Sequence, residues 1–365
     1  MKSETLKLAT IGGDGIGPEV VEAALPAIID AAAAHGVEVV VTELDWGGDR
    51  LLRTGDAMPA DAIEVVRAHD AVLLGAVGHP ELAPDVSVWS LVLPLRKALD
   101  LYVNLRPVRA WTGVESAVKN VESTDLVVVR ENTEGEYSGI GGRVHSGSDN
   151  EIATDVAVHT RRAIRRVARH AFDLARARGQ RLTLVTKSNV SRHGYALWDE
   201  VVDELGAAEY GDVPWDKGYV DAMAARLIER PTSLGVLLCS NLFGDILSDG
   251  AAPLAGGLGM VPSANVSPDT DSPGVFEPVH GSAPDIAGRG IANPMACILS
   301  GAMLLRANGL DAAASSLEDA VGVAVQVDEG RTPDIGGRAT TRSAGEVVRV
   351  ALRSALESTA RVATQ

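Results

Sequence analysis

Short apolar runs alternate with helix-type patterns along most of this chain. The runs are four to six residues long and cover residues 6–11, 37–41, 71–76, 126–129, 182–186 and 236–239. This alternation is typical of proteins in which helices cover a largely parallel sheet. We therefore predict an α/β fold with a largely parallel central sheet.

The clearest helix is predicted just after the first run. Pro18 stands at a plausible first position, apolar side chains follow at helical spacing through Ile29, and Gly36 comes after the end. Pro26 lies inside this pattern and predicts a kink, because proline cannot donate the helical hydrogen bond.

Two segments depart from the alternation. Residues 136–151 (EYSGIGGRVHSGSDNE) are rich in glycine and serine and lack helical periodicity, which predicts a hairpin-like arm of the kind that often mediates dimers. Residues 276–294 form a polar loop, rich in glycine and proline, that is too elaborate for a simple connection. We expect this loop to bind a ligand.

The composition narrows the range of partners. The chain has 365 residues with 46% hydrophobic content, enough for a large core and two domains. Its net charge of −16 would repel nucleic acid and anionic membranes. The residues MKSETLKLATIGGDG contain no apolar region before a cleavage site, so we expect no signal peptide, and no run of roughly 18 apolar residues occurs. Cys239 and Cys297 lie in apolar runs, which indicates reduced, buried thiols and a cytoplasmic location.

The segment Gly12-Gly-Asp-Gly-Ile-Gly-Pro18 follows the first predicted strand and opens the first helix. Backbone amides at such a place can approach an anion. Pro18 stands where the last glycine of G-x-G-x-x-G would be, so the dinucleotide fingerprint fails. A plain tight turn and a loop beside a cofactor both remain open.

Three arginines point to a carboxylate substrate. Arg96, Arg106 and Arg130 lie in LPLRKALD, YVNLRPV and VVVRENTEGEY, the last at the end of an apolar strand. A strand end is where open α/β sheets bind ligands, and a guanidinium can grip a carboxylate with two hydrogen bonds. Three such groups would suit a dicarboxylate, although an isolated arginine is usually structural.

Acidic and basic side chains follow two other strands. Asp245 and Asp249 are four residues apart and would share one helix face, which favours a Mg²⁺ or Mn²⁺ site over a solvated acidic face. Lys187 follows the run 182–186 and is one of only six lysines among 33 basic residues. A partly buried lysine can exchange protons whereas arginine cannot, although a surface role for Lys187 stays open.

Five motifs occur in an order that a known family shows. They are GGDGIGPEV, LRKALDLYVNLRPV, VRENTEGEYSG, NLFGDILSD and VFEPVHGSAPDIAGRGIANP. Together they resemble the signatures of the β-decarboxylating dehydrogenases, the isocitrate/isopropylmalate dehydrogenase family. The resemblance implies the two-domain fold of that family, which is not a Rossmann fold. One domain would combine residues 1–105 with 260–365, and the other would be residues 106–259, including the arm.

The resemblance also implies a set of site residues. Arg96, Arg106 and Arg130 would bind the substrate carboxylates, and Tyr137 and Lys187 would handle protons. Mg²⁺ or Mn²⁺ would be held by Asp245, Asp249 and Asp221, with K⁺ as a candidate further ion. Contacts to NAD would come from Ile11, Trp89, Asn189, His280, Gly281, Ser282, Ala283, Asp285, Ile286 and Asn293. Because Lys187 and Asp221 would cross from the partner, the family implies a homodimer with shared active sites.

By the same resemblance, NAD⁺ would oxidise a malate-type 2-hydroxy acid, which then loses CO₂. The metal-bound hydroxyl would lose its proton to neutral Lys187, and Tyr137 would protonate carbon 3 after decarboxylation. Asp285 would accept hydrogen bonds from the adenosine ribose and repel a 2′-phosphate, and Ile286 offers no phosphate contact. These residues favour NAD over NADP.

The substrate is predicted from Trp89. Isopropylmalate enzymes usually have an acidic residue seven positions before the first clamp arginine, where this chain has Trp89. That residue, with AVGHP, ENTEGEYSGIGGR and TKSN, resembles the tartrate/D-malate branch. We expect D-malate or tartrate, with 3-isopropylmalate as the alternative if Trp89 only packs. A catalytically silent regulatory subunit is a further alternative, but it should lack some of the site residues and none is missing.

Overall fold

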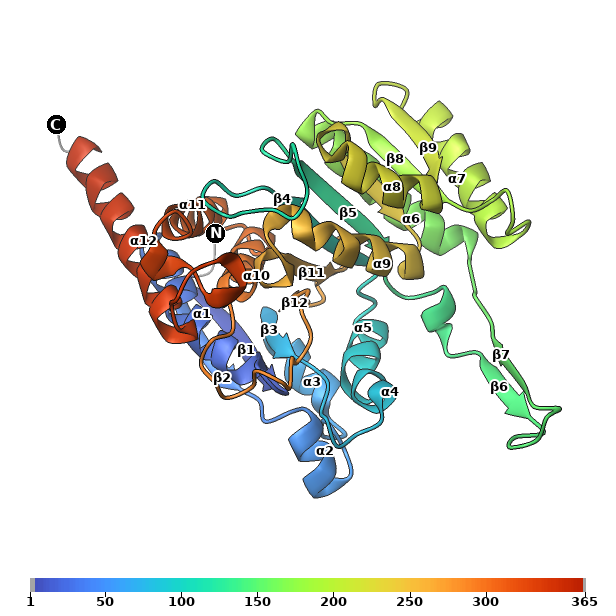
Figure 1. The fold of residues 1–365 in the computed structure, drawn as a ribbon, viewed down its shortest axis with the longest axis horizontal. Helices are drawn as coiled ribbons and strands as arrows, with labels where there is room; N and C mark the ends of the chain where they lie inside the picture. Colours follow the sequence, from blue (N-terminus) through green and yellow to red (C-terminus); the bar gives the residue numbers. More distant parts are fainter. Residues whose placement is uncertain (1–3, 364–365) are drawn as a thin grey trace.

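A mixed sheet of ten strands runs through the computed structural model, which describes residues 4–363 (Figure 1). The strand order is β2-β1-β3-β12-β11-β4-β5-β10-β8-β9. The strands are β1 (Thr5–Gly13), β2 (Glu38–Glu43), β3 (Ala71–Ala76), β4 (Val103–Arg109), β5 (Asp125–Glu131), β8 (Leu182–Thr186), β9 (Trp215–Tyr219), β10 (Val236–Cys239), β11 (Pro262–Val266) and β12 (Gly274–Pro278). Every apolar run named above lies in or overlaps one of them, so the predicted strands are confirmed.

The sheet changes direction at its centre. Neighbouring strands are parallel at both ends, whereas β12–β11, β11–β4 and β4–β5 are antiparallel. The predicted α/β fold with a largely parallel sheet is therefore confirmed, and the central reversal distinguishes it from a singly directed Rossmann sheet.

Helices cover both faces of this sheet (Figure 1). They are α1 (Gly17–Ala33), α2 (Gly48–Thr54), α3 (Ala62–Arg67), α4 (Pro84–Ser87), α5 (Leu93–Ala98), α6 (Arg161–Arg178), α7 (Gly194–Ala208), α8 (Val220–Glu229), α9 (Asn241–Ala251), α10 (Met295–Ala307), α11 (Asp311–Ala324) and α12 (Thr341–Ala363). The predicted first helix is α1, with Pro18 in its first turn, and it continues without a break through Pro26. No helix among residues 4–363 has the length and apolarity needed to cross a bilayer.

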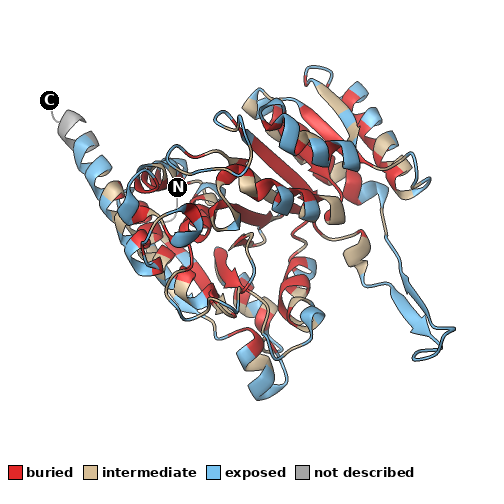
Figure 2. Cartoon of the chain, in the orientation of Figure 1, coloured by how far each residue is buried: buried red, intermediate tan, exposed pale blue. Residues whose placement is uncertain are grey.

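The strands and the helices packed on them form the buried interior (Figure 2). One apolar cluster joins α1, α10, α11 and α12 to the sheet, and a second joins α6 and α7 to β5, β8 and β10. Cys239 and Cys297 are buried and unpaired, as predicted. Burial raises the pKa of the Cys297 thiol to about 12, which keeps it protonated.

The predicted arm exists but is longer than the glycine-rich segment. Two short antiparallel strands, β6 (Gly141–Val144) and β7 (Ile152–Asp155), form a hairpin that projects from the body (Figure 1). The second strand lies beyond residue 151, because Gly141–Val144 pairs with Ile152–Asp155, which is not rich in glycine. The domain boundaries at residues 105 and 260 stay a prediction, since the sheet continues through β4, β5 and β11.

A buried carboxylate holds the turn between β1 and α1. Asp14 is 3% exposed and accepts hydrogen bonds from the backbone amides of Gly48 (2.6 Å) and Gly78 (2.7 Å). The Asp14 amide donates to the carbonyl of Ala76 at the end of β3 (2.8 Å). The segment 12–18 is therefore a tight turn, and one aspartate ties it to two neighbouring loops.

Replacing this carboxylate should destabilise the fold. Asp14→Ala leaves the buried amide of Gly48 and the partly buried amide of Gly78 without an acceptor, so we expect the free energy of unfolding to fall by about 2–4 kcal/mol. Urea unfolding followed by circular dichroism measures the change. Asp49→Ala, which removes an exposed carboxylate from the same region, should stay within about 0.5 kcal/mol of the parent protein. Equal effects of the two substitutions would contradict this role of Asp14.

Candidate active site

The three predicted clamp arginines are buried at one place in the structure. Arg96 lies in the last turn of α5, Arg106 in β4 and Arg130 near the end of β5, and they are 7%, 6% and 1% exposed. Burial lowers the pKa of Arg130 to about 10, Asp245 opposes this shift, and the charges of Arg106 and Arg96 add to it. The structure therefore brings the three cations together, and they require buried anionic partners.

Helix α9 supplies two of these partners. Asp245 and Asp249 are one helical turn apart, and Arg130 forms an ion pair with Asp245. Arg106 Nη1 lies 3.2 Å from Asp245 Oδ1 and 2.9 Å from Asp249 Oδ1. Gly244 allows the close approach, because a Cβ there would lie 2.6 Å from the Arg130 side chain. The predicted placement of the two aspartates on one helix is confirmed.

Tyr137 joins the same cluster from another element. It lies in a short 3-10 turn, η2 (Glu136–Ser138), at the base of the arm. Its hydroxyl donates a hydrogen bond to Asp245 Oδ2 (2.7 Å), and the Arg130 guanidinium carbon is 5.3 Å from its ring centroid. The phenol, three arginines and two carboxylates thus form one site.

The cluster shifts the acidity of its members in different directions. Burial favours the protonated form of Asp245, but Arg130 and Arg106 outweigh it and hold the pKa of this carboxyl below its usual value. Burial and the neighbouring Asp245 raise the pKa of Asp249. Burial, followed by Asp245, raises the pKa of the Tyr137 phenol. Tyr137 therefore keeps its proton at neutral pH. Of the two aspartates, Asp249 has the charge that nearby cations stabilise less.

Lys187 and Asp221 form a separate pair. Lys187 follows β8, Asp221 lies in the first turn of α8, and their Nζ and Oδ1 atoms are 2.5 Å apart. Neither residue has a hydrogen bond or ion pair with the arginine cluster. Among residues 4–363, no three His, Cys, Asp or Glu side chains gather in a way that could hold a metal ion. The predicted set of three aspartates is therefore not assembled within one chain.

The acidic pair on α9 has the chemistry of a divalent-cation site. Carboxylate oxygens are the ligands that Mg²⁺ and Mn²⁺ prefer. The Asp249 side chain is 52% exposed, so a cation can reach it, and a positive charge there would relieve its repulsion from Asp245. Two carboxylates fill only part of such a coordination shell, so water, a substrate or a second chain would supply the other oxygen ligands.

The predicted nucleotide loop packs against the turn that follows β1. The carbonyl of Ser282 accepts a hydrogen bond from the Ile16 amide (2.9 Å), and Ala283 has the left-handed φ of 38°. Gly281 and Asp285 are exposed, and Ile286 is partly buried. The His280 Nε2 atom is buried without a hydrogen-bond partner, and burial lowers the pKa of this imidazole. The Nδ1 atom bonds the carbonyl of Gly281 (2.9 Å), so the Nε2 atom of the neutral ring remains for a polar ligand such as a nucleotide.

The other predicted cofactor contacts, Trp89, Asn189, Asn293 and Ile11, lie on different elements of the fold. Trp89 is 43% exposed in a π-helical turn, η1 (Val88–Val92). Asn189 is exposed in the turn after β8, and buried Asn293 donates to Asp334 (3.0 Å). The Ile11 side chain is fully buried in the apolar core, so only its backbone could meet a cofactor.

Sequence reasoning missed a buried polar network beside the arginines. Arg96 Nη2 pairs with Glu277 Oε1 (2.7 Å), and the same oxygen accepts from Asn265 Nδ2 (2.9 Å). Asn265 Oδ1 in turn accepts from Asn104 (3.0 Å) and Asn132 (2.9 Å). Asn104, Asn265 and Glu277 come from three different strands, Asn132 follows β5 and Arg96 lies in α5, so only the tertiary structure shows that they meet. The sequence feature that could have indicated this network is a polar residue inside an otherwise apolar strand.

Asn241 was missed although its motif was recognised. Both Nε and Nη2 of Arg130 donate to Asn241 Oδ1, at 2.9 and 2.7 Å. Asn241 Nδ2 donates to the carbonyl of Glu134 (2.9 Å), just before Tyr137 in the chain. Asn241 thus fixes the plane of the Arg130 guanidinium and connects it to the segment that carries the phenol.

Comparison with known proteins places this site in a family. Residues 7–349 match the sequence profile described as isocitrate/isopropylmalate dehydrogenase. This chain belongs to that family. The predicted family, and with it a decarboxylating dehydrogenase, is thereby confirmed.

Individual relatives carry different substrate names. A probable tartrate dehydrogenase/decarboxylase of Agrobacterium vitis is 45% identical over 348 residues, which cover 94% of each chain. A 3-isopropylmalate dehydrogenase of Corynebacterium efficiens is 47% identical over 317 residues, covering 87% of this chain and 92% of the relative. The crystal structure of isocitrate dehydrogenase from Methylococcus capsulatus superposes with a TM-score of 0.87 at 37% identity, covering 95% of this chain and 99% of that one.

The two aspartates of α9 should respond oppositely to neutralisation in metal-free protein at neutral pH. Asp245→Asn removes the anion that compensates Arg130, so we expect unfolding free energy to fall by about 1.5–3 kcal/mol. Asp249→Asn removes a charge that the fold disfavours and keeps an acceptor for Arg106, so stability should rise slightly. Urea unfolding in the presence of a chelator measures both.

The pH dependence follows from the lowered pKa of Asp245. A carboxyl with a folded pKa below its unfolded value stabilises the fold above the unfolded pKa and loses this effect as pH falls through the folded pKa. The difference between parent and Asp245→Asn should therefore shrink below about pH 4. If the free energy of unfolding of each variant differed from that of the parent by the same amount at every pH, the two aspartates would not differ in pKa as described.

Proposed function

We propose that this enzyme is an NAD-dependent, Mg²⁺- or Mn²⁺-dependent dehydrogenase that oxidises and decarboxylates D-malate or tartrate. The observation that carries the proposal is the buried cluster of Arg96, Arg106, Arg130, Asp245 and Tyr137. A guanidinium edge binds carboxylates, and several arginines converging from different elements suit a small dicarboxylic acid.

The residues of the cluster have separate tasks in this reaction. Arg106 and Arg130 bind and orient the substrate carboxylates, which replace part of their present pairing with α9. A divalent cation held by Asp245 and Asp249 would polarise the substrate oxygen. Tyr137 keeps its proton because its pKa is raised, so it can donate that proton to carbon 3 after CO₂ has left. Lys187 accepts the hydroxyl proton.

A second copy of the chain would complete the site. Lys187 and Asp221 lie apart from the arginine cluster within one chain. Exposed apolar side chains on α8 and α9, Ile228 (66%) and Ile246 (59%), lie on the helices that carry Asp221 and Asp245. The arm is a two-stranded hairpin with both strands exposed, and such a hairpin is marginally stable unless it is packed. These features support a homodimer in which each site takes Lys187 and Asp221 from the partner.

Trp89 supports a small substrate. Its ring packs over Gly139, two residues after Tyr137, and Lys97 Nζ lies 5.1 Å from the ring centroid. A bulky aromatic group against the segment that carries Tyr137 should leave less room for a branched substituent on carbon 3. The second candidate is 3-isopropylmalate, which is favoured by the 47% identity to a 3-isopropylmalate dehydrogenase.

A substrate panel tests the proposed activity. NADH formation with Mn²⁺ and K⁺ present should give the highest kcat/KM with D-malate or tartrate. The value for 3-isopropylmalate should be at least about 10-fold lower. NADP⁺ should be the poorer cofactor, and Asp285→Ala should narrow the difference. A preference for 3-isopropylmalate would assign Trp89 to packing, and nucleotide binding without turnover of any acid would favour a silent subunit.

Subunit complementation tests the shared site. Tyr137→Phe and Lys187→Met should each lower kcat by about 10²–10⁴-fold. A heterodimer of the two variants would contain one site with both substitutions and one intact site. Random mixing should therefore restore about a quarter of parental activity if the two residues come from different chains. Failure to restore activity in a verified heterodimer would place both residues in a site within one chain.

A further inference from the structure

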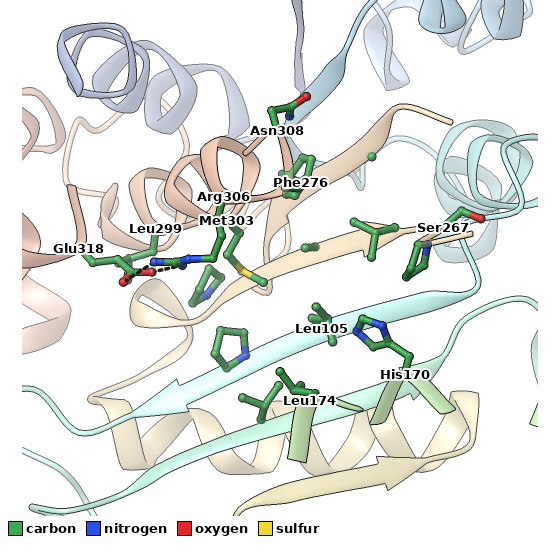
Figure 3. Close-up of a pocket in the computed structure, with 18 of the residues that line it drawn as sticks. Leu105, His170, Leu174, Ser267, Phe276, Leu299, Met303, Arg306, Asn308 and Glu318 are labelled. Carbon is green, nitrogen blue, oxygen red and sulfur yellow. Dashed lines mark hydrogen bonds and ion pairs between the residues drawn. The ribbon is translucent and has the colours of Figure 1, made fainter. Parts of the chain in front are cut away.

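A cavity of about 960 Å³ lies on the face of the sheet opposite the arginine cluster. Figure 3 shows it over the central strands, with Leu299 and Met303 of α10 on one side and His170 and Leu174 of α6 on the other. Side chains alternate along a strand, so Leu105 and Pro107 of β4 line the cavity whereas Arg106 faces α9. The cavity is therefore separate from the candidate active site.

The size and floor of this cavity suit a small molecule. Pockets that bind small ligands commonly measure about 300–1,000 Å³ and are mostly apolar with a few polar groups. Four adjacent strands, β5, β4, β11 and β12, supply the floor. The main apolar lining residues are Leu105, Val127, Leu174, Ala264, Phe276 and Met303.

The charged groups around the cavity are more evenly balanced than the rest of the chain. Four arginines and four carboxylates line it, whereas the whole chain has a net charge of −16. Two of the arginines are paired, Arg178 with Asp125 (2.8 Å) and Arg306 with Glu318 (2.7 Å). An anion would thus meet less repulsion here than over most of the surface.

Of the other two arginines, Arg67 donates a hydrogen bond to the carbonyl of Ala98 (3.1 Å), whereas Arg109 is available to a ligand. Its guanidinium has no ion pair and no hydrogen bond to another described residue. Instead it stacks on Trp111, with its central carbon 3.7 Å from the ring centroid. Stacking occupies the flat face of a guanidinium and leaves the N–H edge free, which is the edge that binds a carboxylate with two hydrogen bonds.

His170 provides a second polar group. It lines the cavity from α6, and its Nε2 atom is buried without a hydrogen-bond partner. Burial lowers the pKa of the imidazole, so the ring is neutral at pH 7 and can either donate or accept a hydrogen bond. Buried polar atoms are normally satisfied, so this nitrogen also favours a polar occupant.

We propose that this cavity binds a small carboxylic acid with an apolar, ring-sized body. Its carboxylate binds the N–H edge of Arg109, its body lies on the apolar floor, and a polar substituent meets His170. The occupant contacts β4 and β5, the strands whose alternate side chains include Arg106 and Arg130. Such a ligand would be distinct from the proposed hydroxy-acid substrate.

A matched pair of probes tests the site. Binding of naphthylacetate and of uncharged naphthylacetamide to the purified protein is measured by ligand-observed NMR, first alone and then with either NAD⁺ or Mg²⁺ and D-malate added, so that turnover cannot occur. We expect the acid to bind about 10-fold more tightly than the amide because of its charge-assisted bonds to Arg109. Arg109→Gln should bring the two probes to within about twofold of each other. Met303→Trp, which fills the cavity, should abolish binding of both.

Controls separate this site from others. Arg342→Gln removes the same charge from exposed α12 and should bind both probes as the parent does. Thermal unfolding establishes whether each variant is folded. If Met303→Trp does not fold, the comparison of Arg109→Gln with the parent tests the site. The proposal fails if the acid shows no advantage over the amide, if Arg109→Gln keeps that advantage, or if NAD⁺ or D-malate displaces the acid. These outcomes do not depend on turnover, so they are independent of the proposed activity.

Discussion

The ion pair between Arg130 and Asp245 is the interaction on which the candidate site depends. An arginine that is 1% exposed is tolerable only with a close anion and satisfied donors, and Asp245 and Asn241 together provide them. The same Asp245 accepts from Tyr137 and lies 3.2 Å from Arg106. One carboxylate therefore sets the positions of two cations and the phenol, and this gives the site its geometry before any ligand binds.

The reversal of strand direction at the centre of the sheet determines which residues of β4 and β5 lie next to each other. Because β4 and β5 are antiparallel neighbours, Arg106 pairs in register with Val128, and Asn104 with Arg130. Both arginines then project from one face toward α9. The alternate residues, Leu105 and Val127, project from the other face into the cavity between α6 and α10. A single pair of strands thus builds a charged surface and an apolar one.

Three features of the single chain have no partner among the residues that the structure describes: the Lys187–Asp221 pair, the arm and exposed apolar side chains on α8 and α9. The pair formed by Lys187 and Asp221 has no contact with the arginine cluster, and the arm projects with both of its strands exposed (Figure 2). Apolar side chains are exposed on α8 and α9, the helices that carry Asp221 and Asp245. These three features have one common explanation in the proposed dimer, where the partner's surface covers the apolar groups and brings the lysine to the site.

The sequence by itself determined the α/β class, the positions of six of the ten strands in the main sheet, the arm and the family, because these depend on local periodicity and on motifs that are contiguous in the chain. It also identified Arg96, Arg106, Arg130, Asp245 and Tyr137, which the structure brings together. Only the tertiary structure decided the role of Glu277 and Asn265 beside Arg96, the extension of the arm through Asp155, and the cavity with Arg109 stacked on Trp111. These depend on strand order and register, which bring together residues far apart in the chain, and no local pattern encodes that pairing.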